Sequence, residues 1–215
     1  PSTTAAPDPS ACTFGDEPVV GDPVEDWATI VVDTENQLPA DFEPPDLVDV
    51  REAGFDSDGQ VRRIVLDDLT KLRRDAEANG TPLMVVSAYR SFSYQQELYD
   101  KKVREEGPTA ARLRTARAGH SEHQLGTTVD VLNPEDEELT PAFGSTPAGK
   151  WVADHAHEYG FVLSYPTESR SRTCYEFEPW HLRYVGREVA AEIRGSDMTP
   201  REWMLARQEG PTGAG

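Results

Sequence analysis

The chain has 215 residues, and its 21 basic and 39 acidic side chains give it a formal net charge of −18. Binding to nucleic acid or to an anionic membrane surface needs a basic face, so this charge argues against both kinds of partner. No run approaches the 18 apolar residues of a transmembrane helix. The 37% of hydrophobic residues nevertheless suffice for a packed core, so we expect one acidic globular domain that is monomeric.

The two ends of the chain differ in composition from its middle. Residues 1–26 are rich in Pro and Asp and show little periodicity, which is typical of an irregular tail or a covering strap. Residues 196–215 end in a stretch rich in Gly and are expected to fray, although Trp203 and Met204 can dock on the domain. The sequence therefore predicts one domain over residues 27–195 between two tails.

The N-terminus also bears on the compartment. It starts with a stretch rich in Pro, Ser, Thr and Ala and has no initiator Met, as a linker does once an export or anchoring segment has been removed. We therefore expect a protein exported from a bacterium, either extracellular or at the cell surface. Cys12 and Cys174 are then a disulfide that pins the tail or two free thiols, and export favours the disulfide.

Helices and strands alternate in the first half of the expected domain. Residues 61–76 follow helical spacing, and residues 82–89 form an apolar, β-branched run, so a helix and a buried strand are expected there. A second helix is expected from Ser93 to Gly107, because Ser93 and Gln96 form a capping-box pattern.

Strands dominate the second half. They are expected over residues 127–132, 161–165 and 173–178, with helices over residues 146–159 and 185–193. Because helices come first and last while the strands cluster late, the sequence predicts an α+β fold with an antiparallel sheet flanked by helices.

A first group of residues with chemical potential surrounds Gly126. His123 and Asp130 lie seven residues apart, and a turn at Gly126 followed by an inward-facing position on the next strand would bring them together. A carboxylate in the middle of an apolar strand is costly to bury unless it meets a cation or a metal. From the spacing alone, an Asp held by an Arg or by backbone N–H groups is the simpler alternative to a metal ligand.

A second group follows at Glu178 and His181. Pro179 excludes a helix interior, so His181 is expected at the end of a strand, just before the last helix. Glu178 and His181 are the residue types that a zinc hydrolase uses as a base and a ligand. An acidic strand that ends in Trp-His is also compatible with ordinary packing.

Taken together, three segments resemble the VanY-type zinc D-alanyl-D-alanine carboxypeptidases, which belong to the hedgehog-like group of zinc peptidases. In chain order they are Ser87–Gln96 (SAYRSFSYQQ), Ser121–Asp130 (SEHQLGTTVD) and Glu178–His181 (EPWH). The resemblance runs from about Trp27 to Gly195. It implies an antiparallel sheet that carries the zinc site.

The resemblance also implies a complete catalytic centre. His123, Asp130 and His181 match the three zinc ligands, with one Zn²⁺ per chain and a fourth position left for water. Glu178 matches the general base that takes a proton from that water.

Further matches concern the substrate. Arg90 matches the arginine that contacts the substrate near the scissile carbonyl, and Gln96 and Ser121 match positions that contact its terminal residue. Such an enzyme removes the C-terminal D-alanine from peptidoglycan stem peptides, with D,D specificity expected and L,D specificity left open.

Two alternatives remain. One is a non-catalytic cell-wall-binding relative, against which the presence of all three ligands and the base argues. The other is a peptidoglycan endopeptidase of the same fold. His155 and His157 are not expected to be ligands, because residues two apart on a helix do not face each other.

Overall fold

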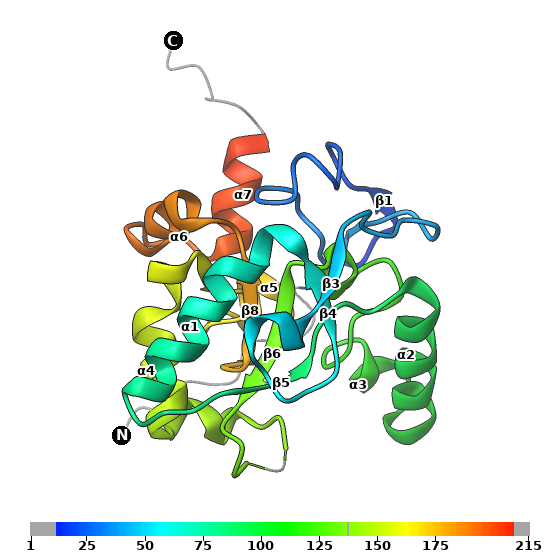
Figure 1. Cartoon of the computed structure of the whole chain (residues 1–215). Helices are drawn as coiled ribbons and strands as arrows, with labels where there is room; N and C mark the ends of the chain where they lie inside the picture. Colours follow the sequence, from blue (N-terminus) through cyan, green and yellow to red (C-terminus); the bar gives the residue numbers. More distant parts are fainter. Residues whose placement is uncertain (1–11, 137, 209–215) are drawn as a thin grey trace.

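A four-stranded antiparallel sheet lies at the centre of the computed structural model, which describes residues 12–136 and 138–208 (Figure 1). Its strands, in spatial order, are β5 (Met84–Ser87), β6 (Thr128–Leu132), β8 (His181–Tyr184) and β7 (Phe161–Leu163). The predicted α+β fold with an antiparallel sheet is thus confirmed.

Helices flank this sheet. In Figure 1, α1 (Leu66–Ala78) and α4 (Pro147–His155) lie to its left, and α2 (Phe92–Glu106) and α3 (Pro108–Ala111) lie to its right. The remaining helices are α5 (Arg170–Thr173), α6 (Arg187–Arg194) and α7 (Pro200–Gln208). Short 3₁₀ turns are η2 (Val50–Ala53), η3 (Arg63–Val65), η4 (Glu122–Leu125), η5 (Pro141–Ser145) and η6 (Ala156–Tyr159).

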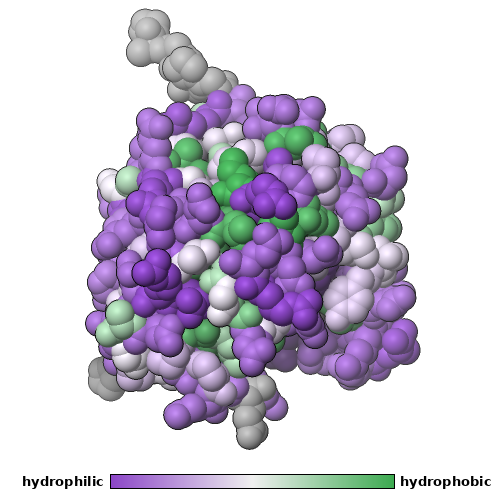
Figure 2. All heavy atoms as spheres, in the orientation of Figure 1, coloured by the Kyte–Doolittle hydropathy of each residue, from purple (hydrophilic) through white to green (hydrophobic). Residues whose placement is uncertain are grey.

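Two small ladders complete the fold. Strand β1 (Glu17–Pro18) pairs in parallel with β2 (Asn36–Gln37), and β3 (Leu47–Asp49) pairs antiparallel with β4 (Gln60–Arg62). No helix within residues 12–136 and 138–208 is long and apolar enough to cross a bilayer. The face shown in Figure 2 is mostly hydrophilic, with apolar side chains gathered in one area above its centre.

Strand β6 separates the core from the opposite face of the sheet. Val129 and Val131 are fully buried and belong to the main hydrophobic cluster. Successive side chains on a strand point to opposite faces, so Asp130 between them is turned away from this cluster. The strand register pairs Asp130 with His181 on β8 and with Ser87 on β5. The sheet therefore presents a carboxylate and an imidazole side by side.

Two expected helix starts are wrong for local reasons. The helix expected over residues 61–76 starts only at Leu66, because Val61 pairs with Val48 in the β3–β4 ladder. The second helix is capped by Ser91 and not by Ser93, since the Ser91 hydroxyl accepts a hydrogen bond from the Tyr94 amide at 3.2 Å.

The strand expected over residues 173–178 is absent from this described segment. Arg170–Thr173 forms α5, and Cys174 ends it in a left-handed conformation with φ of 66°. The chain then continues irregularly to Pro179, whose missing N–H is unsuited to a central strand. As a result, His181 opens β8 instead of ending the preceding strand.

Both chain ends are attached to the domain as far as they are described. A disulfide joins Cys12 to Cys174, and β1 pairs with β2. At the other end, α7 buries Trp203 and Met204 in a second apolar cluster with α6, which confirms that these two side chains dock on the domain. Burial of these two side chains explains why the helix forms. Residues 1–11 and 209–215 of the expected tails lie outside the described residues.

Docking of α7 can be tested by truncating its most buried side chain. Met204 is 1% exposed, so Met204→Ala should lower the free energy of unfolding by about 2–5 kcal/mol. Met198, 49% exposed, is the matched control, and Met198→Ala should stay within about 0.5 kcal/mol of the wild type. Urea denaturation measures both. Equal midpoints for the two variants would show that α7 contributes nothing to stability.

Candidate active site

Three buried side chains converge on one point of the sheet. His123 comes from η4, Asp130 from β6 and His181 from β8, and one potential ligand atom of each lies within 4.8 Å of the others. His123 Nε2 lies 3.3 Å from Asp130 Oδ2, and His181 Nδ1 lies 3.3 Å from Asp130 Oδ1. Two imidazoles and one carboxylate form a donor set that suits catalytic zinc.

A glycine turn brings the first two residues together. Gly126 ends η4 with φ of 70°, a conformation that favours glycine, and β6 begins two residues later. A Cβ at Gly126 would also come within 3.0 Å of side-chain atoms of Arg62 and Leu47. The reversal of the chain at Gly126 lets His123 face Asp130.

The hydrogen bonds of this cluster test whether a metal fits. His123 Nδ1 lies 2.6 Å from the carbonyl oxygen of Ala88, which leaves Nε2 as the free nitrogen. His123 Nε2 and Asp130 Oδ1 are buried and have no hydrogen-bond partner among the described residues. Buried polar atoms rarely stay unpaired in folded proteins. A divalent cation between them would satisfy both atoms, so the residues fit a metal.

The electrostatics of the cluster also favour a cation. Burial, together with nearby Arg90, lowers the pKa of His123 to about 4, which keeps its imidazole neutral and able to bind metal. Burial alone would lower the pKa of His181, but the nearby carboxylates of Asp130 and Glu122 raise it to about 10. The two carboxylates therefore create a site that stabilises positive charge.

Glu178 lies beside the metal-binding cluster. Its Oε2 is 3.6 Å from His181 Nδ1, and its backbone N–H donates to the Tyr165 carbonyl at 3.1 Å. Burial is the main cause that raises the pKa of Glu178 to about 7. A carboxylate with such a pKa can accept and return a proton near neutral pH.

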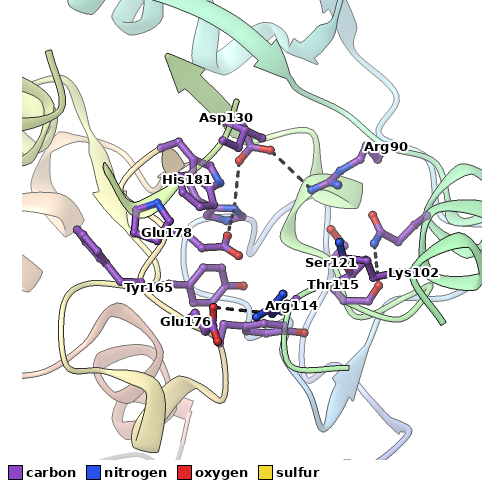
Figure 3. Close-up of a pocket in the computed structure, with 17 residues that line it drawn as sticks. Arg90, Lys102, Arg114, Thr115, Ser121, Asp130, Tyr165, Glu176, Glu178 and His181 are labelled. Atoms are coloured by element: carbon purple, nitrogen blue, oxygen red, sulfur yellow. Dashed lines mark hydrogen bonds and ion pairs between the residues drawn. The ribbon is translucent and has the colours of Figure 1, made fainter. Parts of the chain in front are cut away.

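A cavity of about 540 Å³ opens onto these groups (Figure 3). Arg90 and Ser121 line it, and Arg90 Nη2 lies 3.9 Å from Asp130 Oδ2. The other lining residues include Gln95, Lys102, Arg114, Thr115, Ala116, Tyr165, Tyr175, Glu176, Phe177 and Trp180. The cavity thus brings Asp130, His181 and Glu178 together with basic and aromatic side chains.

Gln96 does not reach this cavity. It is exposed, and its Nε2 donates to Asp100 Oδ1 on the same helix at 2.8 Å. Its neighbour Gln95 is 1% exposed and lines the cavity, with Nε2 bonded to the Ala116 carbonyl at 2.7 Å. Because adjacent helix positions point about 100° apart, only one of the two glutamines can face the site. The capping-box interpretation placed the helix start at Ser93, whereas Ser91 caps the helix in the structure.

The His-x-His pair lies apart from the cluster. The ring of His155 stacks on Trp151 at 4.9 Å, and its Nδ1 lies 2.9 Å from the Trp151 carbonyl oxygen. Neither His155 nor His157 belongs to the group of potential ligands found among the described residues. The helix argument against them is therefore consistent with their positions.

Glu122 contacts His181 in a way that the sequence did not predict. Its side chain is buried, and Oε2 lies 2.9 Å from His181 Nε2 and accepts from the Ser164 hydroxyl at 2.6 Å. Oε1 accepts from Arg183 Nη1 at 2.8 Å. Because Nε2 of His181 is engaged by Glu122, Nδ1 is the nitrogen left for a metal. With a metal on Nδ1, the ring proton would stay on Nε2 and point toward Glu122, which holds the orientation of the His181 ring.

Arg183 keeps this carboxylate ionised. Burial alone would raise the pKa of Glu122, but the charge of Arg183 and the hydrogen bond from His181 lower it to about 2. Arg183 is 1% exposed and also donates to the carbonyl oxygens of Trp27 and Ile30, at 3.1 and 2.7 Å. A buried cation and a buried anion therefore compensate each other directly behind the metal-binding cluster.

Removal of the negative charge tests the role of Glu122. Glu122→Gln keeps the shape of the side chain but weakens its hold on His181. We expect zinc affinity to fall roughly 10- to 100-fold, as for other losses of a ligand's hydrogen-bond partner. Competition with a chromophoric chelator on the folded protein measures this affinity.

Ser164→Ala is the matched control for this experiment. It removes another hydrogen bond to the same carboxylate and leaves the contact between Glu122 and His181 in place. Its zinc affinity should stay near that of the wild type. A Glu122→Gln protein that binds zinc as tightly as the control would rule out the orienting role.

Comparison with known proteins agrees with this geometry. Residues 58–187 match the VanY family, described as D-alanyl-D-alanine carboxypeptidase. The putative carboxypeptidase YodJ of Bacillus subtilis is 40% identical over 179 residues, which cover 80% of this chain and 65% of YodJ. The chain thus spans slightly less than two thirds of that relative.

Two solved structures are also similar. One is the LD-carboxypeptidase LdcB, with a TM-score of 0.75 and 38% identity over 81% of this chain and 84% of that one. The other is a variant of the vancomycin-resistance D,D-pentapeptidase VanY in complex with Zn(II), with a TM-score of 0.71 and 28% identity over 83% and 99%. With its sequence match and its buried His, Asp and His side chains, this chain belongs to the VanY family of D-alanyl-D-alanine carboxypeptidases.

Proposed function

We propose that this chain is a zinc carboxypeptidase that removes the C-terminal D-alanine from peptidoglycan stem peptides. The observation that carries the proposal is the convergence of His123, Asp130 and His181 in one cluster, next to Glu178, with Asp130, His181 and Glu178 lining the cavity. Membership of the VanY family supports the same reaction and the same metal. We propose one zinc ion per chain, which the single three-residue cluster found among the described residues supports.

Each group in the cavity has a chemical task in this proposal. Zinc, when bound, supplies a Lewis acid and a water that ionises near neutral pH. Glu178 accepts the proton of the attacking water and delivers it to the leaving amine. His123, Asp130 and His181 hold the metal. Glu122 keeps the His181 imidazole in the orientation that exposes Nδ1.

Arg90 is proposed to bind the substrate. A guanidinium can hold a carboxylate or a developing oxyanion with two parallel hydrogen bonds. The net charge of −18 repels an anionic peptide at long range, but salt screens this field over about 8 Å. Local cations therefore decide binding, and Arg90, Lys102 and Arg114 all line the cavity. Ser121 lines it as well and is proposed to contact the terminal residue.

The catalytic unit is proposed to comprise residues 27–195, since the family match over residues 58–187 falls inside them.

A location outside the cytoplasm is proposed as well. The disulfide between Cys12 and Cys174 supports it, because such bonds persist in oxidising compartments. Peptidoglycan stem peptides would be the partner of the domain, which we propose to act as a monomer.

Mass spectrometry tests the activity. Muramyl tetrapeptide and pentapeptide are incubated with the protein, with and without a zinc chelator. Loss of one D-alanine that the chelator prevents supports the proposal. Cleavage of the pentapeptide alone would indicate D,D specificity, and cleavage of the tetrapeptide would indicate L,D specificity. Fragments cut within the stem peptide would instead identify an endopeptidase.

The proposed base gives a sharp mutational test. Glu178→Gln keeps the shape of the side chain but cannot accept a proton, so kcat should fall by ~10²–10⁴ while zinc content is unchanged. Glu176→Gln is the matched control, because Glu176 lines the same cavity on the same segment and is not proposed to take the proton. Turnover of Glu178→Gln within tenfold of the wild type would place the base elsewhere.

Arg90 gives a separate test of substrate recognition. Arg90→Lys keeps the positive charge but loses the two-pronged hydrogen bonding, so kcat/KM should fall about 100-fold, the scale for one lost oxyanion donor. Peptides amidated at the C-terminus should be very poor substrates of the wild type. If amidated and free peptides are cleaved equally well, the carboxypeptidase assignment is wrong and an endopeptidase is indicated.

A further inference from the structure

An N-terminal strap, residues 12–18, contacts residues that flank two separate sides of the active-site cavity. One side, the first wall, consists of Arg114, Thr115 and Ala116, which follow α3. The other side, the second wall, consists of residues 175–178, which lie between α5 and β8. The strap precedes the family match over residues 58–187, so it lies outside the matched part of the chain.

The strap is attached to the flanks of the first wall by polar and aromatic contacts. The guanidinium of Arg112 lies over the ring of Phe14, 4.5 Å from its centroid. Arg117 Nη1 donates to Asp16 Oδ1 at 2.7 Å, and its Nη2 donates to the carbonyl of Gly15. Residues 112 and 117 enclose the first wall, so the strap holds both of its ends.

The attachment to the second wall is covalent. Cys12 is bonded to Cys174, and the next residue is Tyr175 of the second wall. Tyr175 is 4% exposed and packs against Tyr165, with ring centroids 4.8 Å apart. The strap therefore reaches from the first wall to the base of the aromatic side of the cavity.

The ion pair between the two walls is weak. Arg114 Nε and Glu176 approach to 4.0 Å, and their side chains are 53% and 41% exposed. An ion pair that is so long and so exposed contributes little to stability. The strap, by comparison, combines a covalent bond with a charged hydrogen bond and a cation–π contact.

We propose that the strap is a positioning element that fixes the spacing of the two walls and so holds the substrate pocket in its binding shape. This inference rests on the proposed function for the identity of the substrate. Glu178 is attached independently through its N–H to the Tyr165 carbonyl, and the metal-binding cluster lies on the sheet and on η4. Loss of the strap should therefore impair substrate binding much more than the chemical step.

Two variants break the strap at opposite ends. Cys12→Ser combined with Cys174→Ser releases the second wall, and Phe14→Ala combined with Asp16→Asn releases the first. Each should raise KM for the peptide roughly tenfold, because a side chain such as Tyr175 must then be ordered on binding. In each variant kcat and zinc content should stay within about twofold of the wild type.

The combination of all four changes tests whether each end of the strap supports its own wall. The middle of the strap is also held to the domain, because the amides of Gly15 and Glu17 donate to the carbonyls of Thr34 and Glu35 at 3.0 and 2.9 Å. Breaking one end therefore leaves the other end attached, and the combined variant should raise KM by about the product of the two single-end effects, roughly 100-fold. A combined variant with the KM of the wild type would overturn the inference. Val20→Ser is the control, because Val20 follows the strap and is 65% exposed. Its KM should be that of the wild type.

Amide hydrogen exchange gives a readout that does not need activity. Residues 112–117 and 174–177 should exchange faster in the strap variants, whereas the Glu178 amide, β6 and β8 should be unaffected. Unchanged KM together with unchanged exchange in folded variants would overturn the strap inference and leave the proposed function intact. A wild type that cleaves no peptide would overturn the proposed function, while the exchange measurements would still decide the role of the strap.

Discussion

The buried carboxylate of Glu122 accepts hydrogen bonds on both oxygens, and much of the surrounding structure follows from this requirement. An ion this deeply buried is tolerated only if its charge is matched, and Arg183 and His181 supply the match. Arg183 in turn needs acceptors for its remaining N–H groups, which the carbonyls of Trp27 and Ile30 provide. Removal of any one member would leave another buried and uncompensated. The geometry of His181 is thus supported by a polar network and not by the ligand alone.

This network explains why distant parts of the chain meet at the sheet. Residues 27–30 precede the first helix by more than thirty positions, yet their carbonyls help to hold the arginine behind the metal-binding cluster. Trp27 also stacks on Tyr184, the last residue of β8, with ring centroids 5.4 Å apart. Residues 27–30 therefore support His181 indirectly, through Arg183 and Glu122. The strap at residues 12–18 instead contacts residues that flank the substrate cavity.

Local sequence signals were sufficient where one short segment determines the geometry. The turn at Gly126 between His123 and Asp130 could be read from seven residues, and Pro179 correctly excluded a helix before His181. Gln95 was missed because the resemblance placed Gln96 at the substrate, and the sequence of this segment does not show which of two adjacent helix positions faces the cavity. Glu122 was missed because its partners Ser164 and Arg183 lie 42 and 61 residues away. The spacing of residues within the segment of Glu122 therefore does not indicate these partners.

The alternation of side chains along β6 joins the hydrophobic core and the metal-binding cluster in one strand. Val129 and Val131 fill the core, and Asp130 serves the opposite face. A slip of β6 by one residue would turn the valines outward and the carboxylate inward, so the core and the ligand set depend on the same strand alignment. A metal bound to His123, Asp130 and His181 would therefore stabilise the alignment in which the two valines fill the core, and would contribute to the stability of the fold.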